Sequence, residues 1–292
     1  MLGFALPQFG DSAHDDLAGF ASTAERLGAA SLWVGDRLLA PVDPVVGYAG
    51  TDSVPVEFRT SLDPFVALSV AAAVTTTVRL GSSVLVAPWY PPAQLARQLT
   101  GIDVVSAGRL VVGLGVGWSP DEYEAAAAPL AGRGAQLDEL LDVLDEWWTN
   151  NPVRHRGKRW SVPRSWVDLK PVQRPHPGVY IGASSRAGLA RIGRRADGWL
   201  PVVRVPDFVR LDLLARQRKA IDAAASDEGR DPSGIGTTVR VNVAPGTSVA
   251  DVADVLRRLT DNGYADSFVD MMFVVTGLKA QLEWVERLLA AS

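Results

Sequence analysis

Short apolar runs alternate along the chain with longer segments in which apolar residues recur every three or four positions. The short runs have the length of buried strands, and the longer segments have the spacing of amphipathic helices. Eight strands are predicted, over residues 2–6, 31–34, 78–86, 109–115, 178–182, 198–201, 236–243 and 267–275. Each is followed by a predicted helix, over residues 15–27, 63–77, 92–106, 135–148, 187–196, 206–228, 248–262 and 278–291.

The order of these elements predicts the fold class. Strands that alternate with helices require a mostly parallel sheet, and eight such units in 292 residues fit an α/β protein of the (β/α)8 TIM-barrel type. A doubly wound sheet with an extra domain is the alternative. No change of composition marks a linker, so we expect a single domain over residues 1–292. Two insertions, about residues 38–62 and 150–177, are expected at the carboxyl-terminal face, where barrel active sites lie.

Composition narrows the class of partner. A formal net charge of -4 argues against a nucleic-acid or anionic-membrane surface. Cysteine is absent, and the three histidines are not paired at metal spacing, so neither disulfides nor a metal site is expected. Without a long apolar span or a signal peptide, the chain is predicted to be cytoplasmic. The excess of arginine over lysine is typical of a GC-rich genome, such as an actinobacterial one.

The stretch RLVVGLGVGWSPDEYE, residues 109–124, raises the question of a nucleotide phosphate loop. A dinucleotide fingerprint follows the first strand and places its third glycine one position later than Gly117, so this interpretation is disfavoured. Ser119 and Glu122 fit the two ends of a helix capping box. The glycines either admit a flat ligand or relieve crowding at the barrel rim, and the turn alone does not decide between these.

Other segments at predicted strand ends also have two interpretations each. Asp36 and Arg37 form either a surface ion pair or a mouth-facing pair that binds a ring edge and an anion. Residues 81–83 interrupt a strong strand, as a structural bulge or as a close approach to a ligand. Residues 182–185 start a helix, where small residues bind phosphate or serine caps the helix. Trp118 either stacks on a planar ligand or packs under loops.

Taken together, these segments resemble the bacterial luciferase-like monooxygenase superfamily and, within it, the branch of oxidoreductases that depend on the deazaflavin coenzyme F420. The resemblance covers nearly the whole chain. It rests on the joint order of SLWVGDRLL (31–39), DPFVALSVAAAVTTTVRLGSSVLVAPWYPP (63–92), LARQLTGIDVVSAGRLVVGLGVGW (95–118), the helix start at 133–141, KPVQRPHPGVYIGASS (170–185) and ADGWLP (196–201). It implies a TIM barrel with a flavin-like ring at its carboxyl-terminal mouth.

The resemblance also assigns residues to the cofactor. Asp36 is the residue that hydrogen-bonds the polar edge of the ring. The strand-3 bulge, often a non-proline cis peptide, backs the ring, and the strand-4 end lines the cofactor. The turn after the fifth strand binds the phosphate, while the glycine run makes room for the ring. The bulge is Ser83 and Val84, the strand-4 end is Val116 and Gly117, and the phosphate-binding turn is Gly182, Ala183, Ser184 and Ser185.

Two positions depart from the pattern of the family's sugar-phosphate and alcohol dehydrogenases. Arg37 stands where those enzymes have histidine, and Trp118 stands where they have glutamate. Arginine is a poor proton donor, because its pKa stays above about 12, but it stabilises negative charge that develops on a substrate oxygen. With Arg37 and Trp118 as the catalytic candidates, we predict hydride transfer from the deazaflavin C5 to a small electron-poor substrate rather than alcohol oxidation.

Two other functions remain open. One is an FMN-dependent monooxygenase that uses O2, and the other is a barrel that binds cofactor without chemistry. The lactyl-glutamate tail of F420 requires a basic groove, for which Arg37, Arg186 and Arg204 lie near the right strand ends, whereas FMN requires only the phosphate turn. The expected partners are a small-molecule substrate and a second copy of the chain in a homodimer, with no nucleic acid and no membrane.

Overall fold

The computed structural model describes residues 1–291, and its main sheet is a closed parallel barrel. Six consecutive positions of the barrel are single strands, in the order β13 (Ser267–Asp270), β1 (Leu2–Ala5), β2 (Ser31–Val34), β3 (Arg79–Ser82), β5 (Leu110–Gly115) and β8 (Gly178–Ile181). The other two positions are each split, into β9 (Gly198–Trp199) and β10 (Val202–Val205), and into β11 (Gly236–Thr237) and β12 (Val239–Val243). Because β9 pairs with β11, β10 with β12, and β12 with β13, the barrel closes.

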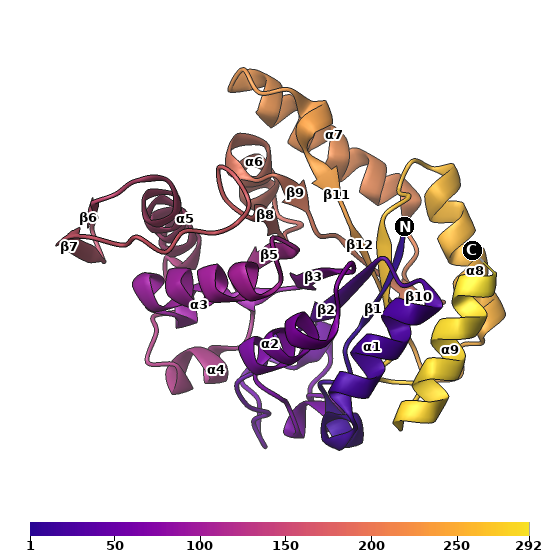
Figure 1. Cartoon of the computed structure of the whole chain (residues 1–292). Coiled ribbons are helices and arrows are strands. Elements are labelled where there is room, and N and C mark those ends of the chain that lie inside the picture. Colours follow the sequence, from indigo (N-terminus) through magenta and orange to yellow (C-terminus); the bar gives the residue numbers. More distant parts are fainter. Residues whose placement is uncertain (292) are drawn as a thin grey trace.

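Helices follow the strands and cover the outside of the barrel (Figure 1). They are α1 (Leu17–Leu27), α2 (Pro64–Val74), α3 (Pro92–Val105), α4 (Pro120–Ala125), α5 (Arg133–Thr149), α6 (Arg186–Arg195), α7 (Leu211–Asp227), α8 (Val249–Asp261) and α9 (Leu278–Ala290). Short 3-10 turns add η1 (Gly10–His14), η2 (Tyr48–Gly50), η3 (Val56–Arg59), η4 (Ala87–Trp89) and η5 (Pro232–Gly234). The predicted (β/α)8 barrel is confirmed. No helix in residues 1–291 is long and apolar enough to cross a membrane.

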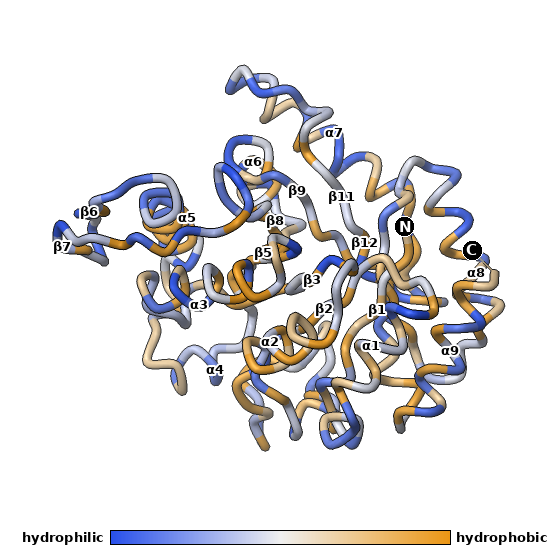
Figure 2. The backbone as a smooth tube through the Cα atoms, in the orientation of Figure 1, coloured by the Kyte–Doolittle hydropathy of each residue, from blue (hydrophilic) through white to orange (hydrophobic). Residues whose placement is uncertain are grey.

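Local chemistry explains where several helices begin and end. Asp63 caps α2 by accepting hydrogen bonds from the amides of Phe65 and Val66, with Pro64 in the first turn. Gly28 ends α1 in the left-handed region, at φ 106°. Figure 2 shows hydrophobic colours along the central strands and α2, whereas the outer end of α7 is hydrophilic.

Several predicted boundaries differ from the observed ones, and the strand predicted over residues 267–275 ends at Asp270. The interruption predicted at residues 81–83 is present but lies slightly later, because the chain leaves the sheet at Ser83 and Val84 before β4 (Leu85–Val86) pairs with the end of β5. The strand predicted over 198–201 continues into β10, since residues 202–205 pair with β12. The helix predicted from 206 therefore begins only at Leu211.

The two insertions lie at opposite ends of the barrel. The first, residues 38–62, lies at the carboxyl-terminal face as predicted, because Tyr48 and Phe58 line a cavity there. The second, residues 150–177, is not at that face: it joins α5 to β8 and so reaches the amino-terminal ends of the strands. Its Gln173 donates a hydrogen bond to the carbonyl of Leu110, at the start of β5 (2.7 Å). Its hairpin of β6 (Val153–Arg156) and β7 (Ser161–Ser165) projects beside α5 (Figure 1).

The inside of the barrel is filled with side chains. Trp33 and Phe268 stack with ring centroids 4.7 Å apart and an interplanar angle of 11°. Val111 and Leu200 pack with them, and all four are buried. This layer fills the barrel on the amino-terminal side of the site, so a ligand can enter only at the carboxyl-terminal end.

Candidate active site

A cavity of about 620 Å³ opens at the carboxyl-terminal ends of the strands. Its volume lies within the range typical of cofactor and substrate sites. All but two of the predicted site residues line it: Asp36, Arg37, Ser83, Val84, Gly117, Trp118, Gly182, Ala183 and Ser184. As predicted, residues that follow four different strands come together in one site.

Val116 and Ser185 lie beside the cavity rather than in its wall. Val116 packs against the core, and its carbonyl accepts a hydrogen bond from the Tyr123 hydroxyl (2.5 Å). Ser185 caps α6, with its Oγ accepting from the amide of Gly188 (3.2 Å). For Ser185 the structure thus shows the capping role that was the alternative to phosphate binding.

The glycine run makes room mainly for the chain itself, which corrects its predicted role. A Cβ on Gly113 would collide with the carbonyl of Ser82, and one on Gly115 would collide with the Val84 side chain. These two glycines therefore admit the segment between β3 and β4. Of the three glycines in the run, Gly117 alone lines the cavity, and it has a φ of +60°, which residues other than glycine rarely adopt.

The Val84 side chain packs between Gly115 and Gly182 and presents an apolar surface to the cavity. The Ser83–Val84 peptide is cis, as the family resemblance implied. A Cβ on Gly182 would lie 2.9 Å from Val84 Cγ1, so Gly115 and Gly182 together leave just enough room for this isopropyl group. A side chain fixed in this way provides a firm apolar backing for a planar ring.

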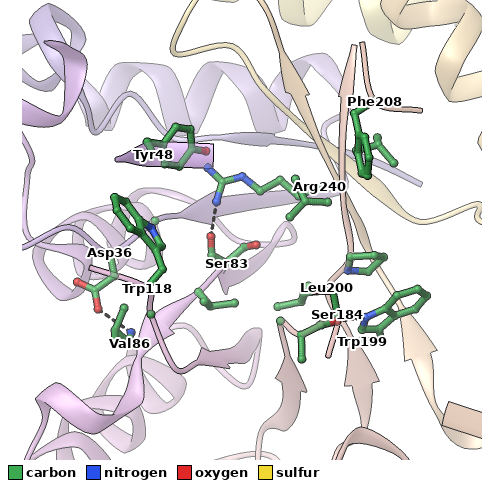
Figure 3. Close-up of a pocket in the computed structure, with 18 of the residues that line it drawn as sticks. Asp36, Tyr48, Ser83, Val86, Trp118, Ser184, Trp199, Leu200, Phe208 and Arg240 are labelled. Carbon is green, nitrogen blue, oxygen red and sulfur yellow. Dashed lines mark hydrogen bonds between the residues drawn. The ribbon is translucent and has the colours of Figure 1, made fainter. Parts of the chain in front are cut away.

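Arg240, from β12, holds the same segment from the other side (Figure 3). Its Nη1 donates to the carbonyl of Ser83 (2.5 Å), and its Nη2 forms an ion pair with Asp270 (2.5 Å). Its Nε donates to Asn242 (2.8 Å). Arg240 is not among the site residues predicted from the sequence. A charged residue inside the apolar run 236–243 was the available signal, because a barrel interior excludes an unpaired charge.

Asp36 ties the loop after β2 to the segment after β3. Its Oδ2 accepts hydrogen bonds from the amide of Val86 (2.9 Å) and from the hydroxyl of Tyr90 (2.8 Å; Figure 3 draws the first). Burial raises the pKa of Asp36 to about 6, and these two hydrogen bonds oppose that rise only in part. Asp36 is therefore a buried carboxyl in the cavity wall whose pKa lies well above that of an ordinary aspartate.

Arg37 is a buried cation rather than half of a surface ion pair. Its guanidinium lies 5.0 Å from the ring centroid of Phe58 and 4.8 Å from that of Trp118. Its Nη1 lies 2.9 Å from Oε2 of Glu122, which is fully buried. Burial lowers the pKa of Arg37 and raises that of Glu122, while each partner opposes the shift of the other.

Glu122 was predicted only as the reciprocal half of a capping box, and that prediction is wrong in part. Ser119 does cap α4, since its Oγ accepts from the Glu122 amide (3.3 Å). The carboxylate, however, does not return to Ser119: it accepts from the amide of Leu38 (2.8 Å) and pairs with Arg37. An acid at this helix position is usual, so the sequence held no signal for its second role.

Aromatic side chains form a further part of the cavity wall, with Tyr48, Phe58 and Trp118 among the lining residues. Tyr48 meets Phe58 edge-on, with centroids 5.1 Å apart at 84°, and lies 5.8 Å from Trp118. Phe273, which follows β13, packs on Tyr48 at 6.5 Å. Tyr48 and Phe58 come from the insertion at residues 38–62, which sequence analysis placed correctly without identifying these two side chains.

The turn before α6 has the features of an anion site. The carbonyls of Ala183 and Ser184 accept hydrogen bonds from Trp199 (3.0 Å) and Gln217 (3.4 Å). The N-terminus of α6 adds amides without helical partners and the positive end of the helix dipole. Arg210 lines the same part of the cavity and is ion-paired with Asp212 (2.9 Å). An apolar backing at Val84 and an anion site at this turn together fit a planar ring that carries a phosphate.

The described residues contain no cluster of three or more His, Cys, Asp or Glu side chains that would hold a metal ion. The ionisable side chains that line the cavity are Asp36, Arg37, Tyr48, Arg210 and Arg240, and Glu122 lies behind Arg37 as its ion-pair partner.

Comparison with known proteins agrees with this geometry. A family model described as luciferase-like monooxygenase matches residues 3–287. An uncharacterized protein of Mycobacterium tuberculosis is 32% identical over 258 residues, which cover 87% of this chain and 86% of that protein. A phthiodiolone/phenolphthiodiolone dimycocerosates ketoreductase of Mycobacterium bovis is 27% identical over 242 residues, or 80% of this chain and 62% of that protein.

Solved structures show the same fold with different activities. A monooxygenase from Streptomyces bottropensis has a TM-score of 0.79 at 17% identity, covering 99% of this chain and 97% of that one. A coenzyme F420-dependent tetrahydromethanopterin reductase from Methanopyrus kandleri has a TM-score of 0.76 at 15% identity, covering 99% and 96%. The chain belongs to the luciferase-like monooxygenase family and is an oxidoreductase of that family.

Proposed function

We propose that the protein is an F420-dependent oxidoreductase that transfers a hydride between the deazaflavin C5 and a small organic substrate, and that it works as a reductase. The observation that carries the proposal is the ion pair of Arg37, which lines the cavity, with the buried Glu122 behind it. It supplies a fixed cation beside the place where a reduced substrate develops negative charge.

Alcohol oxidation would require a base beside the substrate hydroxyl, and Asp36 is the only carboxylate among the described residues that line the cavity. Among the described residues, no histidine lines it. Glu122 is engaged by Arg37 and the Leu38 amide, and Asp36 by Val86 and Tyr90. These contacts favour reduction over removal of a proton from an alcohol.

The residues that would hold the cofactor are those in the cavity wall with the matching chemistry. Val84 would back the ring, Asp36 would face its polar edge, and the turn at Gly182, Ala183 and Ser184 would bind the phosphate. When bound in its reduced form, the deazaflavin supplies two electrons as a hydride. Arg37, between Phe58 and Trp118, would orient the substrate oxygen and exclude water from it.

The choice of F420 over FMN rests on charge along the exit from the phosphate turn. Arg186 is the first residue of α6, Arg210 lines the cavity, and Arg204 lies on β10 with only a loose pair to Asp207 (3.7 Å). These cations suit the anionic tail of F420, which FMN lacks. The ketoreductase and the F420-dependent reductase named among the similar proteins support the same direction of reaction.

Fluorescence-quench titration with F420 and, separately, with FMN tests the proposal. We expect low-micromolar binding of F420 and no saturable binding of FMN. Replacing both Arg186 and Arg210 with glutamine should weaken F420 binding by about tenfold, since each exposed ion pair contributes up to about 1 kcal/mol. Arg216→Gln is the matched control, because Arg216 pairs with Asp212 on α7 but does not line the cavity.

Preference for FMN would move the protein to the monooxygenase function, and binding of neither cofactor would contradict both functions. The homodimer, the single domain and the cytoplasmic location stay predictions.

A further inference from the structure

Tyr48 carries an uncommitted hydroxyl in the wall of the cavity. Two other tyrosines near the site donate theirs, Tyr90 to Asp36 (2.8 Å) and Tyr123 to the Val116 carbonyl (2.5 Å). The Tyr48 hydroxyl, by contrast, makes no hydrogen bond to any residue in the described range 1–291. Figure 3 shows it on the cavity side of the ring, directed toward Arg240. It is a proton donor without an acceptor among the described residues, so it is available to a ligand.

The position of this hydroxyl is well defined. The Tyr48 amide donates to the carbonyl of Ser53 (2.8 Å), and the Thr51 hydroxyl donates to the carbonyl of Tyr48 (2.8 Å). The ring itself is fixed by its edge-on contact with Phe58 and its contacts with Trp118 and Phe273. A donor held by both backbone and ring packing is preorganised for a substrate atom.

The cations of the cavity already have partners. Arg37 is paired with Glu122 (2.9 Å), and Arg240 with Asp270 (2.5 Å). A substrate carboxylate would therefore add an uncompensated negative charge to a largely buried site, which is unfavourable. The remaining wall is mostly apolar, with Phe9, Phe58, Trp118, Val202, Leu213 and Leu214. Such a site suits an uncharged, largely apolar molecule with one polar atom.

We propose that Tyr48 is the catalytic proton donor in the reduction of an uncharged, largely apolar carbonyl compound whose oxygen binds between Tyr48 and Arg37. The inference rests on the proposed reductase function and adds to it a substrate class and a second catalytic group.

The step balances in atoms and electrons. A reduced deazaflavin, when bound, would supply the hydride for an electrophilic carbon of the carbonyl system and would release its own N–H proton to solvent, while the π electrons of the substrate move to the carbonyl oxygen. Tyr48 O–H gives its proton to the substrate, and a proton from water then restores the hydroxyl through the cavity opening. Arg37 and Arg240 would offset the negative charge on the substrate oxygen during transfer.

Equilibrium binding to the cofactor-free protein tests the contact without any turnover. The probes are benzylideneacetone, an uncharged enone, and cinnamate, which has the same skeleton with a carboxylate. We expect the enone to bind at least tenfold more tightly than cinnamate. Tyr48→Phe keeps the ring and should weaken enone binding about fivefold, as the loss of one hydrogen bond does. Tyr264→Phe is the matched control, since Tyr264 is buried outside the cavity.

Single-turnover reduction of benzylideneacetone by the F420H2-loaded protein tests the proton transfer. We expect Tyr48→Phe to slow reduction by at least about 100-fold, the usual contribution of a general acid, with F420 affinity unchanged. The wild-type rate should fall in D2O, and Tyr264→Phe should behave as the wild type in both solvents. A merely structural role of Tyr48 would leave the solvent isotope effect in place.

The two arms fail separately. Equal enone affinity in the wild type and Tyr48→Phe, or tighter binding of cinnamate, would overturn the assignment of Tyr48 whichever cofactor binds. Loss of enone affinity in Tyr48→Phe without turnover by the wild type would support the carbonyl contact and contradict the reductase function. Unchanged turnover in Tyr48→Phe would overturn the proton-donor role.

Discussion

An arginine lies at each end of the barrel, partly buried at the amino-terminal end and largely buried at the carboxyl-terminal end, and the two are used in opposite ways. At the amino-terminal end, Arg109 commits every donor to the chain: Nε to the Ser106 carbonyl (2.7 Å), Nη1 to Thr75 Oγ1 and the Val78 carbonyl (2.8 Å each), and Nη2 to the carbonyls of Ala72 and Thr75 (3.0 and 2.8 Å). At the carboxyl-terminal end, Arg37 has one ion-pair partner and two aromatic rings.

The difference separates a structural from a functional arginine. Arg109 satisfies carbonyls that would otherwise be left without partners where α2 meets β3, so its N–H groups have no capacity left for a ligand. Arg37 is held by stacking and by Glu122, which fix its position and leave other donors uncommitted within the described residues. Removing the first should therefore change stability, and removing the second should change activity.

The largest effect is expected from removal of the Arg37 charge. In the double variant Arg37→Met, Glu122→Gln, the buried pair is replaced without leaving one charge alone. We expect kcat/KM for reduction to fall by about 100- to 1000-fold, the usual effect of losing a charge-stabilising donor. The melting temperature should stay within a few degrees of the wild type. A well-folded double variant with wild-type kcat/KM would remove Arg37 from the mechanism.

Arg109→Met should have the reverse profile. It leaves carbonyls of Ala72, Thr75, Val78 and Ser106 without their donor, and we expect the free energy of unfolding to fall by about 3 kcal/mol. The turnover number per folded molecule should not change. Urea unfolding with active-site titration measures both quantities, and Arg216→Gln on the exposed face of α7 serves as the neutral control. A loss of turnover at unchanged stability would reverse the comparison.

Two carboxyls, one at each end of the barrel, should make the stability of the protein depend on pH in opposite directions. At the mouth, burial raises the pKa of Asp36 from 3.8 to about 6, so the folded state binds this proton more tightly than the unfolded state does. Stability should therefore fall as pH rises from about 4 to 6, by about 3 kcal/mol for such a shift. Subtracting the curve of Asp36→Asn from that of the wild type isolates this contribution, and a difference that is flat over this range would contradict it.

At the base, Glu25 behaves in the opposite way. Burial alone would raise its pKa, but hydrogen bonds from the amides of Thr77, Val78 and Thr76 outweigh burial and lower the pKa to about 2. The stabilisation from Glu25 is complete above about pH 4.5, the unfolded value, and is lost as pH falls through about 2. Glu25→Gln should therefore reduce stability at neutral pH and have less effect under strongly acidic conditions.

The residues at the carboxyl-terminal mouth of the barrel were easier to predict from the sequence than the contacts that hold them in place. Alternating strands and helices bring every strand end to one rim, so Asp36, Arg37, Trp118 and the turn at 182–184 could be placed in one site from local patterns alone. Tyr48 could not be identified in this way, because its position depends on ring contacts with Phe58 in the same insertion and with Phe273, which is far away in the sequence. Glu122 was hidden because one helix position serves both as a cap and as the partner of Arg37.

The glycine run gives the smallest and most specific prediction. At the mouth, Gly115→Ala places a methyl group against Val84, the side chain that would back the cofactor ring. We expect it to weaken cofactor binding by about tenfold, because Val84 must shift into the cavity, while stability falls only modestly. The measurement is the same fluorescence-quench titration that is used to compare F420 with FMN.

Gly198→Ala is the matched change lower in the barrel. Its methyl group would collide with the ring of Tyr180, which packs with the buried layer of Trp33 and Phe268. Overpacking of that layer should lower the free energy of unfolding by about 1–3 kcal/mol and leave the cofactor affinity of the folded protein unchanged, since Gly198 does not line the cavity. If both variants weakened cofactor binding equally, Val84 would have no special role, and the affinity would depend on the packing of the whole barrel.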